Sequence, residues 1–572
     1  MNKLLCAAIL FTSFVGTGEN RSHRFPYRAA GLTERQAAAH LISRFTYGAT
    51  PGQVDEVVKT GLEKWFRQQL DASLPDDSLQ AMLDKYDALK LSDEQIAATF
   101  PKNGQVVRMA VKDGFIDKDS VKADKKEYRE TIRNYMQEKG LKPQQELYRQ
   151  LYCQKILRAA YSNNQLREVM TDLWFNHFNV SITKNDCAGF IPVYERDVIR
   201  AGALGKFGDL LSATAHSPAM LYYLDNFSSS GAMEQPQRRK AQGLNENYAR
   251  ELMELHTLGV DGGYTQQDVT QAARVLTGWT VRESNFFFAP NRHDKGEKTV
   301  LGHHFAAGQG DGEGVELLDI LAHHPSTAHF ISRKIAVRFV SDDPPASLVD
   351  KMAKTFLNKK GDIREVLMTM VSSPEFWSAQ AIREKTKSPF ELAIGAVRSL
   401  RARVDQPAQL YNWVTRMGEK MYFYQAPTGF PDKGQYWINT GSLLNRMNFG
   451  LALAGGRIPG VHFDLAVLNN NHEPESAQAA LVTYCKIIMP ERDLDQTIKR
   501  LTPMLNDPGL QQKVDSASGK VSAAPPQGEM NGMAALSEGQ RERNSMAEGR
   551  ERNTSLTQVV GVIIGSPEFQ RR

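Results

Sequence analysis

The sequence has few cysteines, no broad basic region and no long apolar run beyond its N-terminus. Four cysteines in 572 residues are too few for a disulfide-stabilised scaffold, and neither Cys-x-x-Cys nor a Cys/His spacing typical of structural zinc occurs. A net charge of +5 over this length argues against a nucleic-acid-binding protein. An apolar content of 41% is instead typical of a large globular chain.

The single long apolar stretch lies in MNKLLCAAILFTSFVGTGEN. One lysine precedes the apolar residues and small residues follow them, which is the layout of a secretory signal and is too short to span a membrane. We therefore expect a signal peptide at 1–18, a periplasmic or secreted protein, and no membrane span in the mature chain. The sequence leaves open whether Cys153 and Cys187 form a disulfide bridge.

Helix signals dominate the rest of the chain, and stretches of alternating Val, Ile and Thr are few. Thr33 with Gln36 and Thr265 with the acid three residues later form capping boxes, and Thr50 before Pro51 predicts another helix start. The sequence therefore predicts a mainly α fold, a large multi-helix domain with long loops and little strand.

Composition divides this domain further. We expect a helical body over 31–500 that carries a charged surface insert at 102–140. Residues 505–556 are rich in Gly, Ser, Gln, Pro and Arg and lack the apolar content needed to offset ordering, so they are expected to be disordered. The segment 557–572 should form a helical tail that packs back on the body.

Two segments share a local pattern. VLMTMVSSPEFW at 366–377 and VVGVIIGSPEFQ at 559–570 both run from apolar residues into Ser-Pro-Glu-Phe. The pattern predicts a helix that ends before the proline, with the glutamate and phenylalanine docked back on it.

The stretch LNENYARELMELHTLGVDGG, at 244–263, concentrates charge on one helix. On a helical wheel Tyr248, Leu252 and Leu255 share one face, while a stripe of Glu246, Arg250, Glu251 and Glu254 lies opposite. Spacing alone favours an exposed, salt-bridged face. The alternative is a carboxylate–arginine cluster at the mouth of a pocket.

A second stretch, LREVMTDLWFNHFNVSITK at 166–184, strengthens the alternative. It places four polar residues along one side of a helix whose other side is aromatic and carries His177; these four are Glu168, Asp172, Asn176 and Asn179. An aromatic helix is buried on more than one face, so the acids need partners, which Arg200 or Arg250 could supply. Either a structural polar network or an acid/base site would result.

Metal and nucleophile motifs are not found. The spacing of Glu251, Glu254 and His256 does not match a di-iron bundle, and no His-Glu-x-x-His or calcium loop occurs. A divalent metal held by Asp172, His177, Glu251 or Glu254 remains conceivable, although no cofactor is predicted. No Gly-x-Ser-x-Gly elbow or phosphate-binding Gly-rich loop occurs either.

Histidines in two other segments and one aromatic loop complete the candidates. His293–Asp294 is expected in a loop, where an exposed pair could serve as acid or base, although a structural role is favoured. His324–Pro325 is interpreted as structural, with the ring of His324 meeting a backbone group at a helix start. The loop QAPTGFPDKGQYWINTG at 425–441 contains Phe430, Tyr436 and Trp437. These rings could bind a sugar ring or a peptide, or could pin the loop to the core.

The chain resembles a known family in several separate blocks that occur in one order. They include LWFNHFNV, NENYARELMELHTLGVDGGYTQQDV, ARVLTGW, HHPSTAHFISRKIAVRFVSDDPP, GDIREVL, SPEFW and PTGFPDKGQYW. Together they are similar to the large bacterial family known as domain of unknown function 1800. The resemblance implies one long helical domain in an exported bacterial protein and transfers no catalytic residue. It also hints at a partner, a second exported protein encoded nearby.

Two functions follow from these candidates. The first is an envelope hydrolase or modifying enzyme, with Glu251, Glu254, Asp172 and His177 as acid/base residues and Arg250 orienting an anionic group. The second is a non-catalytic envelope protein that binds a polymer or a protein partner through Phe430, Tyr436 and Trp437, its polar helices forming buried structural networks.

Overall fold

Helices form nearly all of the regular structure. The computed structural model describes residues 25–116, 125–184, 187–231, 243–505, 509 and 554–572. Strands form only short antiparallel pairs, so the predicted mainly α fold is confirmed. The expected signal peptide and nearly all of the expected disordered segment lie outside the described residues. Within the described ranges no helix is long and apolar enough to cross a membrane.

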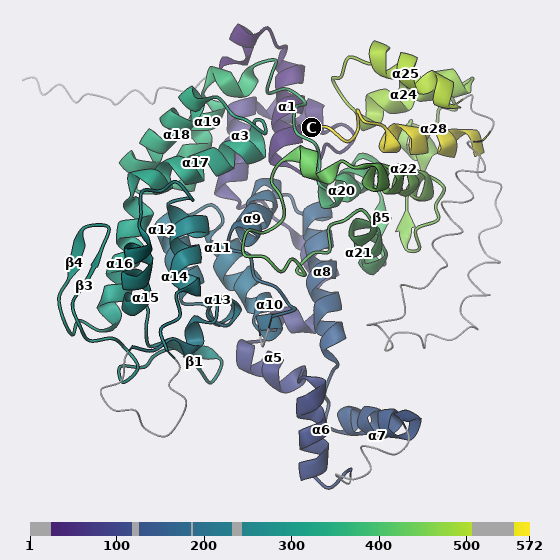
Figure 1. Ribbon diagram of the computed structural model, residues 1–572. Helices are drawn as coiled ribbons and strands as arrows, with labels where there is room; N and C mark the ends of the chain where they lie inside the picture. Colours follow the sequence, from purple (N-terminus) through teal and green to yellow (C-terminus); the bar gives the residue numbers. More distant parts are fainter. Residues whose placement is uncertain (1–24, 117–124, 185–186, 232–242, 506–508, 510–553) are drawn as a thin grey trace, which may run out of the picture.

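The first part of the chain supplies helices at the top, in the centre and at the lower end of the molecule in Figure 1. Its elements are η1 (Pro26–Ala30), α1 (Glu34–Phe45), α2 (Gln53–Thr60), α3 (Leu62–Asp71), α4 (Asp77–Leu83), η2 (Asp87–Lys90), α5 (Asp93–Thr99), α6 (Asn103–Lys112), α7 (Lys125–Glu138), α8 (Gln144–Tyr161) and α9 (Gln165–His177). α8 and α9 run through the middle of the body. α6 and α7 extend away from it (Figure 1) and enclose a small core of their own, formed by Val106, Ala110, Ile116 and Tyr135.

The helix caps agree with the sequence at two positions and differ at a third. Thr33 and Thr265 both form the predicted capping boxes. Thr50 does not cap α2, which begins at Gln53 instead. Gly52 stands at the cap with a φ of 82°, a left-handed conformation that glycine adopts readily, so Pro51 lies in the turn before the helix.

The middle of the chain contains two short π-helical segments among the α-helices. Its elements are η4 (Cys187–Gly189), α10 (Ile191–Val193), the π-helix η5 (Tyr194–Ile199), α11 (Arg200–Gly202), α12 (Phe207–Ala215), α13 (Pro218–Tyr223), η6 (Asn226–Ser228), α14 (Asn247–Glu251), the π-helix η7 (Leu252–Thr257), α15 (Gln266–Val275), α16 (Asp311–His323), α17 (Pro325–Phe339), α18 (Ala346–Asn358), α19 (Ile363–Val371) and η8 (Pro374–Trp377). Two hairpins interrupt them, β1 (Trp279–Arg282) with β2 (Asn285–Phe288) and β3 (Lys298–Val300) with β4 (His303–Phe305).

His293 and His324, which the sequence places in His-Asp and His-Pro dipeptides, both have structural roles. The ring of His324 accepts the Ser326 N–H at 3.1 Å at the start of α17, as predicted. His293 is buried and its Nδ1 lies 2.9 Å from the carbonyl oxygen of Thr277. Asp294 pairs with Arg274 at 2.8 Å.

The last part of the chain returns to the body. Its elements are α20 (Pro389–Ser399), β5 (Arg403–Val404), α21 (Pro407–Arg416), η9 (Gly434–Trp437), α22 (Thr440–Ala454), β6 (Val461–His462), α23 (Leu465–Leu468), α24 (Ala477–Ile488), α25 (Asp495–Leu505) and α28 (Thr554–Gly565). α28 packs on α22 so closely that a Cβ on Gly450 would lie 2.8 Å from the carbonyl oxygen of Gly561. Beyond α28 the chain reaches α1 (Figure 1), where Arg572 donates to the carbonyl oxygen of Arg44 at 3.3 Å.

The two copies of the Ser-Pro-Glu-Phe pattern share their helix end and their buried phenylalanine, although only the first copy forms a 3-10 helix, η8. α19 and α28 each end just before the Ser-Pro pair. Ser373 and Ser566 each donate to a backbone carbonyl of the preceding turn at 2.7 Å, and the phenylalanines of both copies are buried. The predicted helix end and the burial of the phenylalanine are confirmed, whereas the glutamates pair with other helices, Glu375 with Lys351 on α18 and Glu568 with Arg500 on α25.

Candidate functional site

The polar ladder that begins on α9 is buried or half-buried, and α9 ends at His177, so Asn179 lies just beyond the helix. Arg200 pairs with Glu168 at 2.6 Å, as the sequence suggested. Asn176 exchanges two hydrogen bonds with the backbone of Phe430, at 2.9 Å and 2.7 Å, and Asn179 donates to two carbonyl oxygens of the same loop, those of Tyr424 and Ala426. The ladder therefore fixes the 424–430 loop against α9.

Asp172 lies between Glu168 and Asn176 on α9 and contacts two cations from other helices. Its Oδ1 lies 2.7 Å from the ammonium of Lys155 on α8, and its Oδ2 lies 3.7 Å from the guanidinium of Arg338 on α17. Burial alone would lower the pKa of Lys155, but the charges of Asp172 and Glu195 outweigh it and raise that pKa. Both side chains of the pair are mostly buried.

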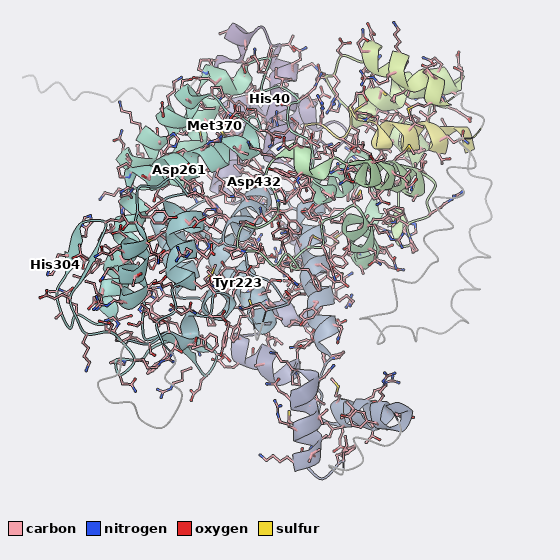
Figure 2. The ribbon with its side chains drawn as sticks, viewed as in Figure 1. His40, Tyr223, Asp261, His304, Met370 and Asp432 are labelled. Atoms are coloured by element: carbon pink, nitrogen blue, oxygen red, sulfur yellow. The ribbon has the colours of Figure 1, made fainter. Side chains whose placement is uncertain are left out.

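Asp172 lines a pocket together with part of the aromatic loop. The cavity has a volume of about 60 Å³, and Phe430 and Trp437 both line it. Figure 2 shows Asp432, another lining residue, near the middle of the body. Tyr436 does not line this pocket and is 61% exposed. The structure thus brings Asp172, Phe430 and Trp437 of the predicted site residues to one place.

Charged residues dominate the pocket wall. Four cationic and four acidic side chains line it: Lys155, Arg338, Lys385 and Arg572, with Asp172, Glu391, Glu419 and Asp432. Several of these side chains form ion pairs. Lys334 pairs with Asp432 at 2.7 Å, and Lys385 pairs with Asp342. Buried charges are tolerated only when they are paired, and most of the charged groups in this wall are paired.

Glu391 is the acid at the centre of this network. It is buried on α20, and its Oε1 lies 2.7 Å from Arg338 and 3.0 Å from Arg572. Burial would raise its pKa, but the two guanidinium groups reverse the effect and lower it to about 2. Glu391 is therefore ionised at neutral pH.

Glu419 has the opposite environment. It is also buried, and its Oε2 accepts the N–H of Phe390 at 2.8 Å. Burial, together with the negative charge of Asp172, raises its pKa to about 7. One wall of the pocket thus presents a carboxyl group that is protonated over a large part of the population at neutral pH.

Tyr422, which also lines the pocket, has an unusual backbone conformation. Its φ is 67°, a value that L side chains adopt rarely and at a cost of about 1–3 kcal/mol. Its hydroxyl donates to Glu195 at 2.7 Å, and its carbonyl oxygen accepts the N–H of Ile182 at 3.0 Å. Such conformations persist where the surroundings hold them, and they concentrate at functional sites.

The predicted charge stripe on α14 and η7 lies away from this pocket. Arg250 pairs with Glu246 at 3.2 Å and Tyr264 donates to Glu254 at 3.4 Å. Glu251 is half-buried, and burial followed by the charge of Glu254 raises its pKa. Among the residues that the structure describes, no contact of Arg250, Glu251 or Glu254 reaches Asp172, and these three do not line its pocket. The five predicted catalytic residues therefore do not form one site.

His177 instead links the two helices through the core. Its Nε2 lies 3.0 Å from the carbonyl oxygen of His256 in η7, where the π-helical turn continues with Leu258 N–H donating to Met253. Burial lowers the pKa of His177 well below its usual value and that of His256 to about 3. Both rings are neutral at physiological pH and pack among aromatic side chains.

Neither a metal cluster nor a disulfide is present in the described part of the chain. No three His, Cys, Asp or Glu side chains there are grouped to hold a metal ion. Cys153, Cys187 and Cys485 are free thiols. Burial raises the pKa of Cys153 to about 11 and that of Cys485 to about 12, so these thiols are poor nucleophiles.

Of the eight charged pocket residues, the sequence singled out only Asp172; the seven missed are Lys155, Arg338, Lys385, Glu391, Glu419, Asp432 and Arg572. A signal existed for one of them. Ser388 and Glu391 form a Ser-x-x-Glu capping box around Pro389, a pattern that marks helix starts and not ion pairs. The second use of Glu391, as the partner of two arginines, arises only when α17 and Arg572 meet.

The family is decided by a match over most of the chain. The sequence profile described as "Protein of unknown function (DUF1800)" matches residues 40–571. The chain belongs to the DUF1800 family. This DUF1800 protein matches no curated protein and no solved structure. All residues that line the pocket around Asp172 lie within the matched region, apart from Arg572.

Proposed function

We propose that this DUF1800 protein is an exported enzyme that hydrolyses or modifies a polar group of a cell-envelope molecule. The observation that carries the proposal is a pair of carboxyl groups, Asp172 and Glu419, that line one pocket in contrasting environments. Asp172 is held between two cations, whereas Glu419 has a backbone amide as its partner. Two carboxyl groups whose environments differ in this way are typical of acid/base catalysis.

The roles follow from these environments. Glu419 would donate a proton to the leaving group, and Asp172 would accept a proton from the attacking water or hydroxyl, with Lys155 orienting its carboxylate. The cavity of about 60 Å³ has room for about two water molecules. It therefore suits the reacting group of a substrate, with the remainder lying along the 425–441 loop.

A catalytic role for Glu251, Glu254, Arg250 and His177 stays a prediction. The pairing of Arg250 with Glu246 and the core position of His177 favour structural roles for these two. The proposal that the protein is exported depends on the signal-peptide pattern of residues 1–18.

The experiment compares the purified protein with Glu419→Gln on three probes: peptidoglycan fragments, envelope polysaccharide and an envelope lipid extract, with products followed by mass spectrometry. We expect the unmodified protein to convert at least one probe. The Glu419→Gln variant should lose about 10²–10⁴-fold of the rate with an unchanged melting temperature. Because the acid must be protonated, the rate of the unmodified protein should fall as pH rises through about 7. Equal product formation by both proteins, or none from any probe, would overturn the proposal.

One observation favours non-catalytic binding as a second candidate. Four apolar side chains next to the pocket loop are exposed: Tyr436 at 61%, Ile438 at 37%, Leu443 at 41% and Leu444 at 51%. Exposed apolar groups of this kind often mark a surface that contacts a partner. In that case the second exported protein encoded nearby would be the partner. Substitution of Tyr436 and Leu444 by serine would then abolish the complex, whereas Glu419→Gln would not affect complex formation.

A further inference from the structure

A second and larger cavity lies on the other side of the Glu391–Arg572 pair. Its volume is about 200 Å³, and its wall comes from α1, α20, the segment 488–493 and the residues after α28. His40, which is labelled near the top of the body in Figure 2, lies on this wall. Glu391 and Arg572 line both cavities, so the two share a charged partition.

The wall of the larger cavity carries an excess of positive charge. Five cationic side chains line it: Arg383, Lys387, Arg492, Arg571 and Arg572. Three acids line it as well, and two of them are already paired, Glu391 in part with Arg572 of the same wall. Glu391 is paired with two arginines, and Glu491 is paired with Arg35 at 2.8 Å. The third acid, Asp493, is exposed.

Four of these cations form no ion pair among the described residues, and Lys387 is the only buried one of the four; the others are Arg383, Arg492 and Arg571. The Lys387 residue is only 7% exposed, and no ion pair joins its ammonium to an acid among the described residues. Its Nζ lies 3.8 Å from the centre of the Phe569 ring. A Cβ on Gly395 would come within 3.4 Å of that Nζ, so the glycine leaves room for the lysine beside α20.

The surroundings of Lys387 make its isolation costly. Burial lowers its pKa well below the usual value, and Arg492, Arg572 and Arg446 act in the same direction against the single acid Glu391. Unpartnered donors are found close by, since the Nε atoms of Arg446 and Arg572 are buried without an acceptor. A buried polar group in this state is stabilised when an acceptor enters.

We propose that this cavity is a binding site for a small anionic metabolite, a phosphate or carboxylate compound whose anionic group Lys387 and Arg572 hold. The cavity is smaller than the roughly 300–1,000 Å³ of sites for drug-sized ligands, which limits the ligand to a small molecule. Neither catalytic carboxyl group is required, so the site stands independently of the proposed function.

The test measures melting temperature and binding heat with inorganic phosphate, sulfate, citrate and glucose 6-phosphate, using the full chain. We expect at least one of these anions to bind the unmodified protein, and Lys387→Met to weaken it about tenfold or more. Binding should also take up protons, seen as heats that vary with the ionisation enthalpy of the buffer, because an anion favours the charged form of Lys387.

Two controls test whether weaker anion binding by Lys387→Met could come from misfolding or from the loss of any positive charge. Lys387→Met should melt at the same or a higher temperature without anion, because methionine needs no ionic partner in a buried position. Lys59→Met, at an exposed position of α2, should bind like the unmodified protein. The proposal is overturned if none of the four anions binds, or if both variants bind as tightly as the unmodified protein.

Discussion

The helix α9 and the segment α14–η7 carry similar residues in very different settings. Both present acids beside a histidine. On α9 the acids Glu168 and Asp172 are mostly buried and pair with cations from α8, α11 and α17. On α14–η7 the pair of Arg250 and Glu246 is more than 30% exposed on both sides. The same sequence pattern therefore yields a pocket wall in one place and a solvated face in the other, and the partners decide which.

The largest expected effect comes from breaking the centre of the buried network. Glu391→Gln should reduce the free energy of unfolding by about 3–5 kcal/mol, because it leaves Arg338 and Arg572 buried without their shared acid. Urea denaturation at pH 7 measures this loss.

The control for Glu391 lies in the solvated segment. Glu254→Gln should change stability by less than about 0.5 kcal/mol. Equal effects of the two substitutions would contradict the distinction between the two regions. Because the pKa of Glu391 is lowered, its contribution is present at pH values above its unfolded pKa and should be lost as pH falls toward 2.

Removal of the loop anchor should have the next largest effect. Asn176→Ala leaves the N–H and carbonyl groups of Phe430 without their partner and should cost about 1–3 kcal/mol. Hydrogen exchange at the amide of Phe430 should accelerate, while exchange in η7 stays unchanged. Unaltered exchange at Phe430 would mean that the ladder does not hold the loop.

The buried histidine of η7 predicts a stability that depends on pH. The pKa of His256 is lowered to about 3, so below about pH 6.5 the unfolded chain binds a proton that the folded chain does not. Stability should therefore fall as pH falls from 7 to 5, with a contribution from His256 of about 2 kcal/mol. Urea denaturation at both pH values should show a smaller fall for His256→Asn. His329→Asn, at a largely exposed position, should keep the full fall.

The smallest effect is expected on the exposed stripe. Arg250→Ala removes a partly exposed ion pair and should change the free energy of unfolding by less than about 1 kcal/mol. A loss comparable with that of Glu391→Gln would show that Arg250 has a buried partner, and would restore the predicted carboxylate–arginine cluster.

The sequence predicted local structure better than it predicted the site. Capping boxes at Thr33 and Thr265 and the Ser-Pro-Glu-Phe turns depend on neighbours in the chain, so they could be identified from spacing. The helical wheel of 244–263 was accurate as far as Leu252. It failed at Leu255, which is only half-buried because η7 is a π-helix, whereas His256, which the wheel places beside the apolar face, is buried as expected.

The pocket depends on contacts between distant parts of the chain. Asp172 meets Lys155 and Arg338, and Glu391 meets Arg572, pairs separated by up to 181 residues in the sequence. No periodicity brings such residues together, so the sequence indicated an acid on a buried helix and could not name its partners. Only tertiary packing separates Asp172 from the stripe on α14–η7.

The most direct measurement of the central claim compares Asp172→Asn with Glu254→Gln in the product assay on the three envelope probes. If the pocket around Asp172 is the chemical centre, Asp172→Asn should abolish product formation while Glu254→Gln retains it, both proteins remaining folded by circular dichroism. Loss of product in Glu254→Gln with full activity in Asp172→Asn would contradict the account and would move the active centre to η7.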